Sequence, residues 1–364
     1  MSSFRPPKAN ATPSTPAAAC APWWRGDRLA ARLPALRARE RIRAAWRQYF
    51  AQQDFIEVDT PALQITAGLE TNLTAFGCTY APPFAAPCTR YLHTSPELAM
   101  KKLLAGGMTR IYQLGHVFRN EPHSRLHHPE FSMLEWYRTQ VDYRALFEDC
   151  RRLLETAYHA VHEEIHEEKG GNRKKQKKNQ KTITYRGVSA RLDQPWQILT
   201  VREAFARYAA IDLPSCRDDP ATLAAAAEQA GIICAADDTF TDIFFKIFLA
   251  RIEPNLGSPA PTLLTEYPAA LAALARPKAD DPTVVERFEL YLCGIELANA
   301  FGELTDPTEH ERRLAGLNPL DPDFMAAVRH GLPTCAGCAL GFDRLVMILT
   351  GAERIQDVLW APVQ

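Results

Sequence analysis

One stretch of the chain, residues 117–137, carries charged and aromatic side chains at regular spacing. It reads VFRNEPHSRLHHPEFSMLEWY, which we interpret as a strand, a loop over 122–129 and a returning strand. Arg119 and Glu121 stand two residues apart in the first strand, a spacing that points both side chains to one face. A guanidinium binds a phosphate through two parallel hydrogen bonds. The stretch therefore offers a phosphate-binding cation beside a carboxylate, although a surface hairpin with a salt bridge would contain the same RNE triplet.

The wider pattern resembles motif 2 of the class II aminoacyl-tRNA synthetases, FRxE…HxPEF. The resemblance implies that Arg119 binds the α-phosphate of ATP and the substrate carboxylate. It implies further that Glu121 accepts a hydrogen bond from the adenine amino group and that Phe131 stacks on the purine. Asn120 and His128 fall in the same nucleotide-binding segment, where the family commonly has Asn at the position of His128.

A second segment, residues 286–304, reads ERFELYLCGIELANAFGEL and predicts two strands that turn at Cys293-Gly294. Several carboxylates on such a hairpin suggest Mg²⁺, a hard cation that needs oxygen ligands. The family resemblance implies that Glu289 and Glu296 bind Mg²⁺, that Asn299 meets the substrate carboxylate and that Glu303 meets a side-chain ammonium. It also places Leu290 at the nucleotide and Glu296 at the substrate.

A third segment, residues 337–344, reads GCALGFDR, runs into a helix and resembles motif 3. Gly341 permits a close approach of the backbone to a nucleotide. Arg344, in the first turn of the helix, is expected to reach the γ-phosphate and the adenine face. Arg119 and Arg344 are thus the expected catalytic residues.

The segment Thr94-Ser95-Pro96-Glu97 predicts a helix capped by Ser95, with Pro96 at its first position and Gly106 just past its end. Glu97 could simply complement the helix dipole. The segment also resembles the part of lysyl-type class II enzymes that holds the substrate's amino group, which makes Ser95, Pro96 and Glu97 expected substrate contacts. Tyr137 belongs to the same lysyl-like set, together with Glu303.

Longer elements must position these residues. Apolar side chains at helical spacing predict a helix over 33–53, followed by a strand over 55–61; this pair resembles motif 1, the dimer interface of the family. A second amphipathic helix is predicted over 142–165, and a capping box over 200–203 starts a further helix. The basic run at about 167–182 is predicted to be a solvated insertion, with contact to an acidic macromolecule as the alternative.

The composition limits the remaining classes. The chain has 364 residues and a formal charge of −1, so no strong basicity indicates nucleic acid, and no apolar run is long enough to span a bilayer. Nine cysteines without framework spacing fit a reducing cytoplasm, and a zinc or redox role for the Cys335–Cys338 pair is disfavoured. We predict a disordered or loosely attached tail over 1–25 and one catalytic domain over 26–364, which includes the basic insertion.

The chain resembles the elongation factor P–(R)-β-lysine ligase family from about residue 34 to its end. Too few residues precede the first motif for the anticodon-binding domain of a lysyl-tRNA synthetase, so tRNA is not an expected partner. Ala298 also stands where tRNA-charging enzymes have Gly. Its additional methyl group would enlarge the wall beside the substrate's α-carbon.

The resemblance implies an α+β fold, an antiparallel sheet flanked by helices in a homodimer. The implied activity uses ATP and Mg²⁺ to activate (R)-β-lysine and transfers it to a lysine of elongation factor P. Three alternatives remain open: a truncated lysyl-tRNA synthetase, a paralogue that makes a free product, and an inactive nucleic-acid-binding adaptor.

Overall fold

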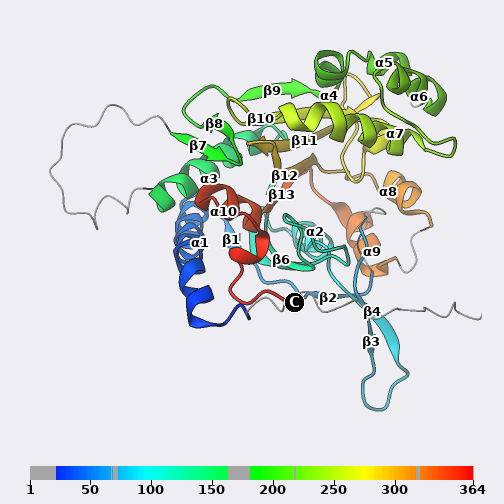
Figure 1. Cartoon of the computed structure of the whole chain (residues 1–364). Coiled ribbons are helices and arrows are strands. Elements are labelled where there is room, and N and C mark those ends of the chain that lie inside the picture. The colour runs from blue at the N-terminus through cyan, green and yellow to red at the C-terminus, as the bar shows by residue number, and fades with distance from the viewer. Residues whose placement is uncertain are drawn as a thin grey trace, which may run out of the picture.

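The computed structural model describes residues 22–66, 68, 73–162, 181–216, 219–316 and 320–363. A large mixed sheet forms its centre, with the strand order β1-β5-β6-β13-β12-β11-β10-β9 (Figure 1). Neighbouring strands are antiparallel except at the two edges, where β1 pairs with β5 and β9 with β10 in parallel. The predicted antiparallel sheet flanked by helices is therefore confirmed, with parallel pairs added at its edges.

The strands of this sheet are short at the edges and long at the centre. They are β1 Ile56–Glu57, β5 Arg110–Phe118, β6 Glu130–Thr139, β9 Gln197–Thr200, β10 Thr262–Pro268, β11 Val284–Leu292, β12 Ile295–Gly302 and β13 Cys335–Gly341. Two small sheets accompany it, made of β2 Leu63–Gln64, β3 Gly77–Tyr80 and β4 Cys88–Leu92, and of β7 Thr182–Tyr185 and β8 Val188–Arg191. The hairpin of β3 and β4 projects from the body of the molecule (Figure 1).

Helices cover the central sheet in two groups. The long helices α1 Gly26–Gln52 and α3 Ala145–His162 pack together with the shorter α10 Phe342–Thr350 beside β6, and the three share one apolar core (Figure 1). A second core lies under α4 Val201–Ala204, α5 Leu213–Cys216, α6 Pro220–Gln229 and α7 Phe240–Ile247, against β10 and β11. The helices α2 Glu97–Ala105, α8 Pro307–Leu314 and α9 Pro322–Gly331 form a smaller group around Phe324.

Two predicted boundaries are corrected by the structure. The helix expected from residue 33 begins at Gly26 and includes Pro34; a proline is common at a helix start, but here regular helix precedes it. The expected strand over 55–61 is reduced to the two residues of β1, because only Ile56 and Glu57 pair with β5.

The motif 2 hairpin is also corrected at one point. Its first strand, β5, ends at Phe118, so Arg119 and Glu121 lie in the loop and not in the strand. The α2 helix begins at Glu97, one residue later than expected, and ends before Gly106 as predicted. The capping box at Thr200 and Glu203 and the turn at Cys293-Gly294 are confirmed.

The predicted tail falls almost entirely in residues 1–21, outside the described residues. The basic run falls outside them as well, except for Lys181 and Thr182, which lead into β7. In the described part of the chain, no helix has both the length and the apolar character needed to cross a membrane.

Candidate active site

Motif 2, the segment 286–304, motif 3 and the TSPE segment meet at one cavity of about 310 Å³, which opens over the central sheet. Strands β6, β13, β12 and β11 form its floor, and the start of α2 and the motif 2 loop form its walls. The expected site residues that line it are Ser95, Pro96, Glu97, Arg119, Glu121, His128, Phe131, Tyr137, Glu289, Glu296, Asn299, Glu303, Gly341 and Arg344. Residues separated by more than 200 positions are thus brought to one face of the sheet.

Alternation along the strands explains which side chains reach the cavity. In β13, Gly337 pairs with Tyr137 and Ala339 pairs with both Glu135 and Asn299, and all five residues face the cavity. A Cβ atom on Gly337 would stand 2.2 Å from the Tyr137 ring and 2.6 Å from Glu303 Oε1. Only glycine therefore fits at this position of the floor. At Gly341 a Cβ would meet Arg344 and Leu297 at ordinary distances, so nothing in the protein itself requires glycine there.

Three expected site residues are not brought to the cavity. Ala298 is buried in the core beneath the sheet, paired with Leu340 and Leu290, on the opposite face of β12 from Asn299. The expected wall beside the substrate's α-carbon is therefore not formed by the Ala298 methyl group, because successive side chains of a strand point to opposite faces. The Leu290 side chain is likewise fully buried in the core, and Asn120 is exposed outside the cavity lining.

Two arginines mark one end of the cavity. The Arg119 guanidinium lies 5.3 Å from the centre of the Phe131 ring. Arg344 donates from Nη1 to the backbone oxygen of Glu296 at 3.1 Å, and its Nη2 lies 3.0 Å from His127 Nε2. Burial and the nearby Arg344 lower the pKa of His127, so its neutral ring can accept this hydrogen bond. Two cations that line the same cavity, one of them over an aromatic ring, form a site suited to a nucleotide phosphate.

A buried ion pair of the preceding residue, Asp343, positions Arg344. Asp343, which is fully buried, pairs with Arg39 of α1 and accepts a hydrogen bond from the Ser132 backbone N–H at 2.7 Å. These contacts attach the first turn of α10 to α1 and β6. The side chain of the next residue, Arg344, is thereby fixed over the cavity.

Carboxylates from the β11–β12 hairpin line the cavity beyond the two arginines. The register places Glu289 opposite Asn299 and Glu296 opposite Tyr291, so the two glutamates are not paired directly across the hairpin. Glu289 accepts hydrogen bonds from Arg287 at 2.6 Å and from Tyr291 OH at 2.5 Å. Burial and the neighbouring Glu289 raise the pKa of Glu296. A cation at this point would relieve that repulsion.

The fit to Mg²⁺ rests on these two carboxylates. Within the described ranges no group of three or more His, Cys, Asp or Glu side chains converges as a metal site. Mg²⁺ is nevertheless commonly held by one or two carboxylates together with substrate phosphates and water. Glu289 and Glu296 beside the arginine end match that requirement.

The other end of the cavity is strongly acidic. Glu97, Glu135 and Glu303 lie together there, with Lys101 among them, and we call these four residues the acid cluster. Glu135 accepts hydrogen bonds from Ser95 Oγ at 2.7 Å and from Tyr137 OH at 2.6 Å. Burial and repulsion from Glu97 raise the pKa of Glu135 to about 8, against the hydrogen bonds that lower it. Such a group of carboxylates is suited to ammonium groups.

Four of the residues that shape the site were missed from the sequence: Lys101, His127, Glu135 and Arg287. Glu135 could have been found, because it precedes Tyr137 by two residues in a strand and therefore shares its face. Arg287, which holds both Glu289 and Asn299, stands two residues before Glu289 in the same way. The i,i+4 spacing of Glu97 and Lys101 could have indicated that pair, but nothing local indicates the second partner, Glu303, which follows β12.

The Cys335–Cys338 pair does not form a site. Cys335 and Cys338 are three residues apart in β13 and belong to two different apolar clusters on opposite sides of the strand. Burial raises the pKa of Cys335 to about 12 and that of Cys338 well above its ordinary value. Both are neutral core thiols at physiological pH.

Comparison with known proteins gives a consistent result. The profile of the class II tRNA synthetases (D, K and N) matches residues 28–364. A protein of Hamiltonella defensa named elongation factor P–(R)-β-lysine ligase is 35% identical over 335 residues, covering 87% of this chain and 91% of the relative. Proteins with the same name from Pectobacterium carotovorum and Yersinia enterocolitica are each 36% identical, covering 88% and 89% of this chain and 92% and 94% of the relatives.

Proposed function

The chain belongs to the class II tRNA synthetases and, within them, to the elongation factor P–(R)-β-lysine ligases; from this premise we propose that it joins (R)-β-lysine to a lysine of elongation factor P. Enzymes of this family are ATP-dependent ligases. The observation that carries the proposal is a cavity with two arginines at one end and three carboxylates at the other. Such a cavity accepts a triphosphate and a diamino acid end to end.

In the first step the substrate carboxylate attacks the α-phosphorus of ATP, and pyrophosphate leaves. We assign Arg119 to the α-phosphate and the carboxylate, where it offsets the charge of both reacting groups. Arg344, supported by His127 and Asp343, is assigned to the outer phosphates. Phe131 and Glu121 would hold the adenine. Fixed charges of this kind stabilise the transition state without reorganisation, since the site is set before reaction.

Glu289 and Glu296 are the residues that would hold Mg²⁺. When bound, the metal would supply positive charge to the phosphate oxygens. Arg287 orients Glu289 by a hydrogen bond of 2.6 Å and Asn299 by one of 3.2 Å. Asn299 is thereby presented to the substrate carboxylate beside the phosphate end.

In the second step the neutral ε-amine of a lysine on the protein substrate attacks the acyl carbon of the adenylate. An amide forms, AMP leaves, and the amine releases a proton. No side chain of the enzyme becomes acylated in this sequence, so catalysis consists of positioning and charge stabilisation. The acceptor side chain must enter from the open side of the cavity, because the sheet closes the floor.

The test is amino-acid-dependent exchange of pyrophosphate into ATP. We expect exchange with (R)-β-lysine to exceed that with (S)-β-lysine and α-lysine. In a separate transfer assay, radiolabelled (R)-β-lysine should be joined to elongation factor P and not to tRNA. Label on tRNA would favour a truncated lysyl-tRNA synthetase. No exchange with any lysine would favour the inactive adaptor.

Arg119→Ala provides the sharpest single variant. Loss of one preorganised charge contact typically costs ~10²-fold or more in rate, so we expect exchange at saturating ATP to fall by at least that factor. Arg125→Ala is the matched control, because Arg125 lies in the same loop and pairs with the exposed Glu353 at 3.2 Å. Near wild-type exchange by Arg119→Ala would overturn the assignment of Arg119.

A further inference from the structure

The acid cluster contains a lysine that the reaction described above does not use. Lys101 lies in α2, one turn after Glu97, and is about 1% exposed. Its Nζ stands 2.5 Å from Glu97 Oε1 and 2.6 Å from Glu303 Oε2. Lys101 is not among the residues that line the cavity, whereas Glu97, Glu135 and Glu303 are. The ammonium therefore contacts two cavity-lining carboxylates from behind.

We propose that Lys101 is a positioning residue that holds Glu97 and Glu303 toward the cavity and sets the charge of the acid cluster to that of a substrate with two ammonium groups. The free protein holds a proton on Glu135 near neutral pH. Once ammonium groups bind and all three carboxylates are ionised, Lys101 leaves two negative charges for the substrate. (R)-β-lysine carries two ammonium groups, and its carboxylate is directed to the arginine end. The inference rests on the proposed function and explains how one end of the cavity selects a diamine.

The energetics favour this role over simple packing. A buried lysine without partners loses its charge, since desolvation penalises the ammonium. Here burial lowers the pKa of Lys101, but Glu303 and Glu97 together raise it above its ordinary value. The lysine is therefore a permanent cation. In return it opposes the effect of burial on Glu303, whose pKa is raised to about 7.

Without Lys101, burial and repulsion would act on Glu303 against the weaker effect of Arg276. Its carboxyl would then hold a proton at neutral pH and offer no full charge to a substrate ammonium. Other charged or titratable groups also act near Glu303 and Lys101. They are Glu97, Glu135, Tyr137, Arg276, His310 and Cys335.

The experiment compares Lys101→Met with the wild type in the pH dependence of kcat/KM for (R)-β-lysine, measured by pyrophosphate exchange. An opposite charge within contact distance shifts a pKa by ~1–3 units. We therefore expect the acid limb to move up by at least about one pH unit in Lys101→Met, with a fall in kcat/KM of ~10-fold or more at pH 7. Raising the pH should restore the activity, and KM for ATP should stay unchanged.

Two further variants separate charge from packing. Lys102→Met is the matched control, because Lys102 is the neighbouring lysine and pairs with Asp321 and Asp323 outside the cavity; its acid limb should match the wild type. Lys101→Arg retains the charge and should return the limb toward its wild-type position. An unmoved limb in folded Lys101→Met would overturn the proposal, since a packing role alone lowers activity equally at every pH.

A measurement on the wild type keeps the inference testable if Lys101→Met does not fold. Two charges left for the substrate predict that 1,4-diaminobutane, which has the amine spacing of β-lysine, inhibits exchange at least ~10-fold better than 1-aminobutane. A ~10-fold difference corresponds to about 1.4 kcal/mol, which a second charged contact is expected to supply. Equal inhibition would overturn the charge count. Failure of the proposed function is seen separately, as an absence of exchange by the wild type with (R)-β-lysine.

Discussion

Strand β6 contributes to a different buried polar cluster on each of its two faces. On one face, Glu135 and Tyr137 belong to the cavity. On the other, Trp136 and Arg138 both donate to Asp149 of α3. Consecutive residues of one strand thus supply a functional cluster and a structural one. The difference between them lies in the balance of charge.

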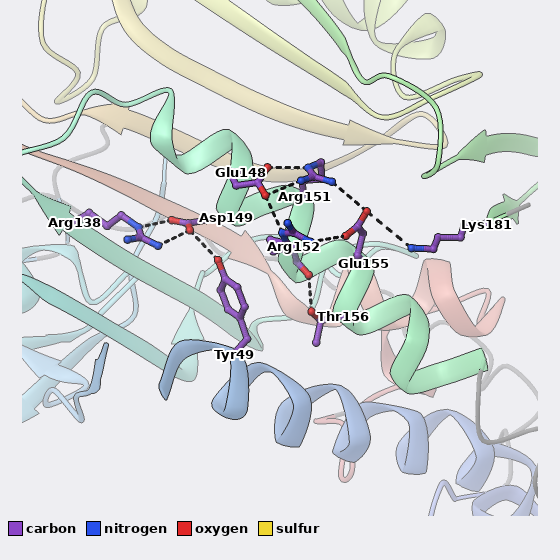
Figure 2. Close-up of polar contacts among 9 residues, drawn as sticks. All are labelled: Tyr49, Arg138, Glu148, Asp149, Arg151, Arg152, Glu155, Thr156 and Lys181. Carbon is purple, nitrogen blue, oxygen red and sulfur yellow. Dashed lines mark hydrogen bonds and ion pairs between the residues drawn. The ribbon is translucent and has the colours of Figure 1, made fainter. Parts of the chain in front are cut away.

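The Asp149 cluster is balanced. Its single carboxylate accepts two hydrogen bonds from Arg138, at 2.6 and 2.7 Å, and one from Tyr49 OH at 2.9 Å (Figure 2). It accepts a further hydrogen bond from Trp136 Nε1 at 3.1 Å. One anion meets one cation, and every oxygen has a donor. The contacts join α1, α3 and β6, so this cluster fixes the packing of the helical layer.

The acid cluster has more carboxylates than cations. Among the described residues, Lys101 is the cation in direct contact with Glu97 and Glu303, and the pKa values of Glu135 and Glu303 rise to about 8 and about 7. A fold does not benefit from such repulsion, which burial strengthens. The comparison teaches that a deficit of buried positive charge identifies where a cationic ligand is expected, while a balanced cluster serves the fold.

The largest expected effect on stability comes from a substitution that breaks the Asp149 cluster. Asp149→Ala leaves Arg138 largely buried without its carboxylate, and removing one partner of a buried pair costs about 3–5 kcal/mol. We expect the free energy of unfolding in urea to fall by that amount, while KM for the amino acid in the folded fraction stays within about 2-fold of the wild type, an order-of-magnitude expectation for a change on the opposite face of the sheet.

Glu148→Ala is its matched control. Glu148 precedes Asp149 in α3 and pairs with Arg151 and Arg152 on the exposed side of the helix (Figure 2). Exposed pairs contribute at most about 1 kcal/mol. If Asp149→Ala and Glu148→Ala lowered the free energy of unfolding equally, burial of the Arg138–Asp149 pair would not be what stabilises this layer.

A smaller and pH-dependent effect should come from the unbalanced cluster. The folded-state pKa of Glu135, about 8, lies above its ordinary value of 4.5, so from about pH 4.5 to 8 the folded protein holds a proton that the unfolded chain has released. Stability from this group is therefore lost as pH rises through that window. Glu135→Gln removes the loss, and its stability relative to the wild type should increase between pH 5 and 8 by about 2–4 kcal/mol.

Urea unfolding at several pH values, without substrate, measures this difference. The same variant should raise KM for (R)-β-lysine, because Glu135 faces the substrate end of the cavity. If the stability difference between Glu135→Gln and the wild type did not change with pH, burial and repulsion would not raise the pKa of Glu135. The comparison between the two clusters would then lose its basis.

The smallest expected effect concerns one donor of the balanced cluster. Tyr49→Phe removes the hydroxyl that donates to Asp149 Oδ1, and one hydrogen bond of this kind contributes about 1 kcal/mol. Burial and Asp149 raise the pKa of Tyr49, so the hydroxyl remains neutral throughout the range and the loss should be the same at pH 5 and 8. A loss that varies with pH would show that the Asp149 cluster also carries unbalanced charge.

The sequence by itself determined which residues meet at the arginine end of the cavity. Arg119, Glu121, Phe131 and Arg344 were expected from motifs that resemble those of a known family, and each lines the cavity. The β11–β12 hairpin and the capping box were predictable from local spacing, since both depend on residues only a few positions apart. Local spacing did less well at element ends, where β5 stops one residue before Arg119.

Only the tertiary structure decided which face of each strand meets the cavity and which charges are shared. Ala298 and Asn299 are neighbours in sequence, yet the pairing of β12 with β13 buries one in the core and presents the other to the site. The contact of Lys101 with Glu303 joins residues 202 positions apart, and the sequence around either one gives no sign of it. The physical reason is that the charge state of a buried group depends on everything packed around it, and that packing exists only once the chain has folded.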